Sequence, residues 1–141
     1  METLSILEQL CFCTTRIETE DSNRNKYSGT GFFFNLTVDD GIVPLLITNK
    51  HVVQGMEKGE FRMTMSSPEG HPLYRNHIQF TWREGFEYNW IFHPNPDVDL
   101  CVLPIAPVFG QEHNLFLRTL EGRLIPAQSD LESLDAIEEV L

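Results

Sequence analysis

Runs of β-forming residues, separated at short intervals by turn residues, fill most of the sequence up to residue 105. The clearest pair, Tyr27 to Val38 and Ile42 to Thr48, flanks Asp39-Asp40-Gly41, and this arrangement is typical of a hairpin. Further runs predict strands at residues 11–19, 60–66, 77–82, 86–92 and 100–105. Short strands at this spacing favour an all-β fold built as an antiparallel barrel or sandwich.

Helical patterns are short and lie around or between these runs. Ser5-Ile6-Leu7-Glu8 has the form of a capping box, which predicts a short N-terminal helix at residues 3–10. Residues 49–54 directly follow a predicted strand and stop before a glycine, so one helical turn is predicted there. Beyond Pro107, residues 114–120 and 130–137 are predicted to be helical or irregular.

The composition is that of an ordinary globular domain, because 41% of the 141 residues are hydrophobic and 22% are charged. Acidic residues outnumber basic ones by 21 to 10, and the net charge of −11 repels phosphate groups, so nucleic acid is not an expected partner. The N-terminus lacks the basic start of a signal peptide, and no apolar run approaches the roughly 18 residues of a membrane span. We therefore expect a cytoplasmic protein with no membrane partner.

The three cysteines predict free thiols rather than a disulfide framework. They are Cys11, Cys13 and Cys101, and the first two lie too close together for an ordinary bridge. On a strand Cys11 and Cys13 would share one face, and buried thiols in a reducing compartment are the simplest interpretation. Zinc is the alternative, since five histidines are present, but no cysteine or histidine spacing supports it. We expect neither a metal nor a cofactor.

Three motifs carry residues suited to acid–base chemistry. Gly29-Thr30-Gly31 leads into an apolar strand, and His51 stands just after a strand, at the start of the predicted helical turn. Asp97 and Asp99 stand before the apolar run at 100–105. Each motif alone has an ordinary explanation, because glycines serve turns and bulges and an aspartate before a strand often belongs to a turn.

Together, however, the motifs resemble the amino-terminal half of the trypsin-like serine peptidases, most closely the HtrA-like branch. The matching stretches are Gly29-Thr30-Gly31-Phe32, Leu46-Ile47-Thr48-Asn49-Lys50-His51-Val52-Val53 and Asp99-Leu100-Cys101-Val102-Leu103. The middle stretch is the most specific, and the likeness covers about residues 10–105. In this family a histidine is the general base and a buried aspartate orients it. The resemblance implies these roles for His51 and Asp99, with Asp97 as the rival acid.

The nucleophile segment of the family, Gly-x-Ser-Gly, is missing from the 141 residues. None of the seven serines has that context: Ser5, Ser22, Ser28, Ser66, Ser67, Ser129 and Ser133. The oxyanion hole and the specificity pocket, which the family builds around that segment, have no counterpart either. We expect a fragment of a longer peptidase, and the apolar C-terminal residues Val140-Leu141 favour this interpretation. A complete, non-catalytic relative that binds protein or peptide is the alternative, and an unrelated β-barrel with a coincidental histidine and aspartate is the least favoured.

The resemblance also implies an organisation and an activity. We expect a helix at 1–10, the first antiparallel β-barrel of a trypsin-like domain at 11–108, and a partly helical connector at 109–141 that leads into an absent second barrel. The full-length protein is expected to be a serine-type endopeptidase acting on polypeptides, and this chain alone is expected to be inactive. Self-association through an uncovered surface near the C-terminus is a further expectation.

Overall fold

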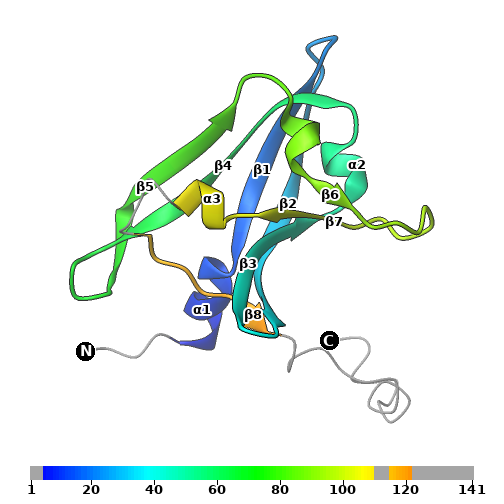
Figure 1. Ribbon diagram of the computed structural model, residues 1–141. Coiled ribbons are helices and arrows are strands. Elements are labelled where there is room, and N and C mark those ends of the chain that lie inside the picture. Colours follow the sequence, from blue (N-terminus) through cyan, green and yellow to red (C-terminus); the bar gives the residue numbers. More distant parts are fainter. Residues whose placement is uncertain (1–4, 110–114, 122–141) are drawn as a thin grey trace, which may run out of the picture.

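The structure is a computed structural model that describes residues 5–109 and 115–121 (Figure 1). It consists mainly of antiparallel strands and a short N-terminal helix, which confirms the predicted all-β class. The strands are β1 (Thr14–Asp21), β2 (Lys26–Val38), β3 (Gly41–Thr48), β4 (Met56–Ser66), β5 (Pro72–Trp82), β6 (Ile91–Phe92), β7 (Cys101–Pro104) and β8 (Leu120–Glu121). The helical elements are α1 (Ile6–Phe12), α2 (Lys50–Val53), the 3-10 helix η1 (Phe86–Asn89) and α3 (Ala106–Phe109).

The strands form one sheet in the order β5-β4-β1-β2-β3-β7-β6, and this order contains a Greek key. Strands β1, β2 and β3 follow one another as hairpins, and β4 returns to pair with β1. β8 lies off this path and pairs in parallel with β2. The predicted closed barrel is not observed, because no pairing among the described residues joins the edge strand β5 to the edge strand β6.

The segment at 86–92 explains much of the open edge, and here the prediction of a strand is wrong. A strand would place Phe86, Tyr88 and Trp90 on one face. Instead Phe86 and Trp90 are buried while Tyr88 is 86% exposed, since the chain turns at Gly85 (φ 65°) into η1. Only two residues remain extended as β6, and a strand of that length leaves the edge of the sheet largely unpaired.

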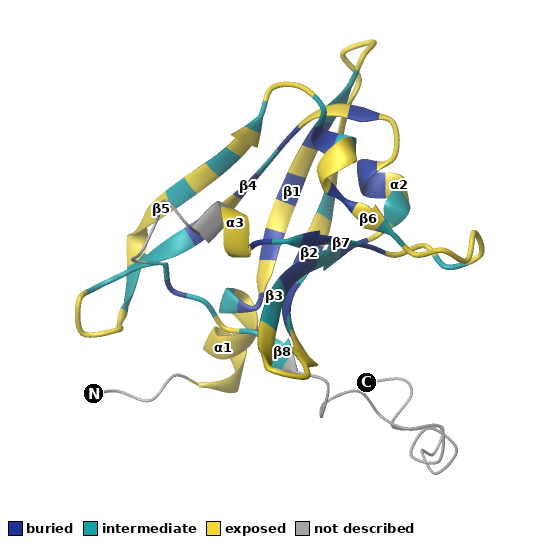
Figure 2. Cartoon of the chain, in the orientation of Figure 1, coloured by how far each residue is buried: buried dark blue, intermediate teal, exposed yellow. Residues whose placement is uncertain are grey.

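Alternation along the strands separates a core-facing side of the sheet from a solvent-facing side (Figure 2). On β1, for example, Thr15, Ile17 and Thr19 are buried, while Arg16 and Glu18 between them are exposed. Core-facing side chains from most strands meet in one cluster that includes Ile17, Phe33, Leu46, Phe61, Met63, Phe86, Trp90, Cys101, Leu103 and Ile105. Burying one large apolar side chain of this kind contributes about 1.5–3 kcal/mol, so this cluster is the main source of the sheet's stability.

An aromatic group with Phe86 at its centre joins η1 to this core. The ring of Phe86 lies 5.5 Å from that of Trp82 and 5.7 Å from that of Trp90, both edge-on. The ring fits against β4 because Gly59 has no side chain: a Cβ there would lie 2.5 Å from the ring atoms of Phe86. Gly59 thus allows the 3-10 helix to pack directly on the sheet.

At the other end of the sheet, α1 shows the predicted capping box. Ser5 Oγ accepts a hydrogen bond from Glu8 N at 3.2 Å, and Glu8 Oε2 accepts one from Ser5 N at 2.9 Å. The helix extends to Phe12, so Cys11 is helical and exposed rather than buried on a strand, which corrects the prediction for this thiol. Cys13 and Cys101 are buried and free, as expected.

Residues 115–121 pack against the sheet beside α1. Phe116 N donates to Thr64 O at 2.8 Å, and the buried ring of Phe116 lies 4.7 Å from that of Phe12. This part of the predicted connector is irregular and extended rather than helical, and the predicted segment 130–137 lies outside the described residues. Among the helices that the structure describes, none is long and apolar enough to cross a membrane.

We predict that Gly59→Ala destabilises the protein by about 1–3 kcal/mol, because the added methyl group must displace Phe86 from a packed core. Gly41→Ala is the matched control, since a Cβ on Gly41 meets no atom within 4 Å. The control should change the free energy of unfolding by less than about 0.5 kcal/mol. Urea unfolding curves of both variants would measure this, and equal losses would contradict the packing argument.

Candidate functional site

The two buried valines that follow His51 hold its helical turn in place. α2 begins where β3 ends, and the side chains of Val52 and Val53 after His51 are 4% and 0% exposed. The turn approaches β2 so closely that a Cβ on Gly29 would lie 2.4 Å from a methyl carbon of Val52. The first motif therefore supports the site by leaving room for α2, rather than by forming a turn.

Strand pairing brings Asp99 to the same edge of the sheet. Thr48, the last residue of β3, pairs with Cys101 on β7, and Asp99 precedes this pair by two residues while His51 follows it by three. Two further hydrogen bonds fix the loop before β7 against α2. Asn49 Nδ2 donates to Asp99 O at 2.9 Å, and Lys50 Nζ donates to the carbonyl of Asn95 at 3.0 Å.

His51 and Asp99 are in direct contact. His51 Nδ1 lies 2.6 Å from Asp99 Oδ2, and the backbone N–H of His51 donates to Asp99 Oδ1 at 3.1 Å. Both carboxylate oxygens therefore bind the histidine, and the ionised carboxylate places the proton on Nδ1. This leaves Nε2 as the nitrogen that can accept a proton from another molecule.

Asp97, the rival acid, takes no part in this contact. It is exposed, and its backbone N–H donates to Asn95 Oδ1 at 2.9 Å within the turn that precedes Asp99. The backbone N–H of Asn95 in turn donates a hydrogen bond to His93 Nδ1 at 3.0 Å. The structure thus brings His51 and Asp99 together and leaves Asp97 as a turn residue.

The contact lowers the pKa of Asp99 below that of an ordinary aspartate. The largest cause is the side-chain hydrogen bond from His51, with help from the backbone N–H of the same residue, while desolvation opposes the change. The pair is open to solvent, because the side chains of His51 and Asp99 are 73% and 49% exposed. An exposed pair is weakened by water and salt, so the contact positions the imidazole more than it stabilises the fold.

Cys101 is the nearest thiol in the chain to Asp99, and it is unsuited to act as a nucleophile. It is 1% exposed, and burial, with a smaller contribution from Asp99, raises its pKa to about 12. Within the described residues, no serine, threonine or cysteine is hydrogen-bonded to the imidazole of His51. The described part of the chain therefore pairs an imidazole with a carboxylate at this site and has no hydroxyl or thiol bonded to the imidazole.

Two contributing residues were not singled out from the sequence. Asn49 and Lys50 hold the loop of Asp99 through hydrogen bonds. Both belong to the stretch around His51 that carried the resemblance, but nothing in the sequence indicated that they bind this loop. In the part of the chain that the structure describes, no three histidine, cysteine, aspartate or glutamate residues are grouped as a metal would need. Comparisons with protein-family models, with curated proteins and with solved structures gave no match.

We predict that the Asp99 carboxyl titrates in the folded protein with a midpoint below the ordinary aspartate value of about 3.9. Because the folded pKa is lowered, the stability it contributes is present above the ordinary pKa and is lost as the pH falls through the folded pKa. Carbon-13 NMR of the side-chain carboxyl would measure the midpoint. His51→Ala should raise it toward the ordinary value, and Asp97→Asn should leave it unchanged. A midpoint of the Asp99 titration that is unchanged by His51→Ala would show that the contact does not persist in solution.

The burial of two thiols predicts a simple chemical result. Ellman's reagent should modify Cys11 rapidly in the native protein, while Cys13 and Cys101, which are 5% and 1% exposed, should react only on unfolding. Cys11→Ser should therefore abolish the rapid phase. A rapid phase that survives this substitution would mean that the core around Cys101 opens readily and that Asp99 is less firmly held than its contacts indicate.

Proposed function

We propose that the protein is a serine-type endopeptidase of the trypsin-like kind, to which this chain contributes the general base His51 and the orienting acid Asp99. The observation that carries the proposal is the contact between His51 Nδ1 and Asp99 Oδ2 at 2.6 Å. It joins two residues 48 positions apart that stand in the two most informative stretches of the resemblance. A histidine oriented through Nδ1 by an ionised carboxylate is the arrangement that such hydrolysis requires.

The geometry allows both proton transfers of the reaction. As a serine oxygen attacks the carbonyl carbon of a peptide, Nε2 of His51 takes the hydroxyl proton, and the imidazolium that forms is stabilised by Asp99. The same nitrogen then gives the proton to the departing amine, which leaves an acyl-enzyme. Water, deprotonated by Nε2, then attacks the acyl carbon; the bond to the serine oxygen breaks, the serine regains the proton from Nε2, and the carboxylic acid is released. Asp99 remains ionised throughout, and its lowered pKa suits that role.

The fold supports this proposal in two ways. The Greek-key order around β1 to β4 is compatible with an antiparallel barrel, although the sheet is open between β5 and β6. The base and the acid stand at strand ends, fixed by the buried Val52 and Val53 and by the pairing of Thr48 with Cys101. A rigid support of this kind suits groups that must be held within a fraction of an ångström.

The proposal requires a nucleophile and oxyanion-hole donors from a polypeptide segment outside these 141 residues. The solvent exposure of the pair leaves room for such a segment above His51. Covering the pair would exclude water and strengthen the contact between the imidazole and the carboxylate, because both would then lie in a medium of lower dielectric constant. The absent segment is therefore expected to supply the serine and the environment in which His51 works.

A fluorophosphonate probe, which labels activated serines, tests the proposal. The chain of 141 residues should remain unlabelled and should not hydrolyse casein. A polypeptide that joins this chain to a Gly-x-Ser-Gly segment should be labelled; His51→Ala should abolish labelling, and Asp99→Asn should reduce the rate by about 10⁴. Asp97→Asn is the matched control and should retain full activity.

Two results would overturn this proposal. Labelling of the 141-residue chain itself would show that a nucleophile is already present. Labelling of the longer polypeptide that survives His51→Ala would show that the histidine is not the base.

A second candidate function is a binding module without catalysis. The observation in its favour is β5, an edge strand of 11 residues that has no partner on its outer side among the described strands. Such an edge can add a strand from another polypeptide through backbone hydrogen bonds. The two functions differ in their dependence on His51, because strand addition at β5 would be unaffected by His51→Ala.

A further inference from the structure

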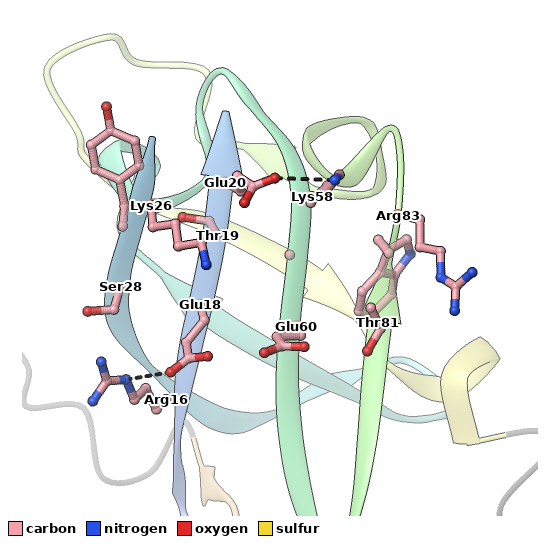
Figure 3. Close-up of a pocket in the computed structure, with 13 residues that line it drawn as sticks. Arg16, Glu18, Thr19, Glu20, Lys26, Ser28, Lys58, Glu60, Thr81 and Arg83 are labelled. Carbon is pink, nitrogen blue, oxygen red and sulfur yellow. Dashed lines mark ion pairs between the residues drawn. The ribbon is translucent and has the colours of Figure 1, made fainter. Parts of the chain in front are cut away.

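A hollow lined by charged side chains lies on the solvent-facing side of β1, β2, β4 and β5, away from His51 and Asp99. The sheet is hollowed there to a volume of about 730 Å³ (Figure 3). Four basic residues line the hollow, Arg16, Lys26, Lys58 and Arg83, together with three acidic ones, Glu18, Glu20 and Glu60. The hollow thus holds four of the chain's ten basic residues but only three of its 21 acidic residues. In a chain with a net charge of −11, the hollow is therefore a mixed-charge surface that is much less acidic than the chain as a whole.

Strand register sets these charges in rows. Glu20 pairs with Lys26 on β2 and with Lys58 on β4, and Arg83 directly follows the residue that ends β5. Two residues further along the strands, Glu18 pairs with Glu60. One row is therefore mainly basic, and the neighbouring row, between Ser28 and Thr81, is acidic.

Ion pairs within the hollow cancel part of this charge. Arg16 Nε lies 3.2 Å from Glu18 Oε1, and Lys58 Nζ lies 3.2 Å from Glu20 Oε2. Lys26 and Arg83 have no ion pair within the described residues, and Glu60 accepts a hydrogen bond only from the neutral amide of Gln79. Among the described side chains, Lys26 and Arg83 thus remain unpaired at the two ends of the first row, and Glu60 remains without a basic partner in the neighbouring row.

This remaining pattern has a cost that a ligand would relieve. Glu18 and Glu60 face each other directly on neighbouring strands, where like charges destabilise a sheet, and Arg16 offsets the charge of Glu18 but not that of Glu60. Figure 3 shows both carboxylates in the middle of the hollow, with Lys26 reaching over β1 from the β2 side and Arg83 at the outer, β5 side. A ligand with a basic group at its centre and an acidic group at each end would neutralise all three positions.

The spacing fits an extended polypeptide. The backbones of Lys26 and Arg83 are separated by three strand spacings, which is about 14 Å. Residues i and i+4 of an extended peptide lie about 13 Å apart and point to the same side as residue i+2. A nucleic acid strand fits less well, because its unbroken row of phosphates would pass over Glu18 and Glu60.

We infer that this hollow binds an extended polypeptide segment that carries acidic residues at positions i and i+4 and a basic residue at position i+2. The two acidic side chains bind Lys26 and Arg83, and the central basic side chain binds Glu18 and Glu60. Thr81, which pairs with Glu60 in the acidic row, also lines the hollow and can bind a polar group of the same segment. This binding requires neither His51 nor a nucleophile, so it is independent of the proposed hydrolysis.

Fluorescence anisotropy with two labelled peptides tests the inference. The probe is Gly-Glu-Ser-Lys-Ser-Glu-Gly, and the control peptide, Gly-Lys-Ser-Glu-Ser-Lys-Gly, has the same length with the charges inverted. At low ionic strength the probe should bind at least about tenfold more tightly than the control peptide, and added salt should reduce this preference. A short oligothymidylate strand should bind more weakly than the probe.

Variants of exposed residues make the test specific. The double substitution Lys26→Gln and Arg83→Gln should remove the preference for the probe, while Arg24→Gln, a basic residue in the β1–β2 loop outside the hollow, should preserve it. Far-UV circular dichroism would verify that each variant is folded. Failure of the probe to bind, equal binding of the two peptides, a preference that survives the double substitution, or tighter binding of the oligothymidylate would each overturn the inference.

Discussion

The candidate site depends on a contact that only glycine permits, the approach of α2 to β2. A side chain at Gly29 would overlap Val52, and Val52 with Val53 fixes the turn in which His51 lies. The partner of His51 is fixed from the other side, because the pairing of β3 with β7 determines where Asp99 stands. His51 and Asp99 are therefore exposed, while Val52, Val53 and the paired residues Thr48 and Cys101, which help to position them, are buried. Such a division keeps the geometry rigid and the imidazole accessible.

Much of the sheet could be predicted because its determinants are local. The hairpin of β2 and β3 follows from two β-forming runs on either side of an Asp-Asp-Gly turn, and the observed strands end within a residue of the predicted runs. The capping box of α1 is equally local. The contact of His51 with Asp99 is different, since it spans 48 residues and no local rule connects them. Only the resemblance suggested the pair, and its catalytic role stays a prediction.

The failures have physical causes that a single strand's pattern does not contain. Aromatic residues at alternate positions in 86–92 are typical of a strand. In the structure, however, Phe86 packs against Gly59, and the left-handed backbone of Gly85 directs the chain into that position. Among the described strands β5 has no partner on its outer side and β6 is only two residues long, so a closed barrel is not observed. Cys11 was misplaced for a related reason: the helix that Ser5 and Glu8 begin continues past the predicted end, up to Phe12.

Net charge does not describe how charges are arranged on the surface. The value of −11 describes the whole chain, and the expectation that nucleic acid is not a partner, which rests on it, stays a prediction. Read along β1 alone, Arg16, Glu18 and Glu20 are the ordinary outer residues of an alternating strand. Register changes this picture, because it sets Glu20 between Lys26 and Lys58 and sets Glu18 opposite Glu60. Lys58 and Glu60 lie on β4, and no local sequence signal aligns that strand with β1. The rows of charge across β2, β1 and β4 therefore become visible only when the pairing of the strands is known.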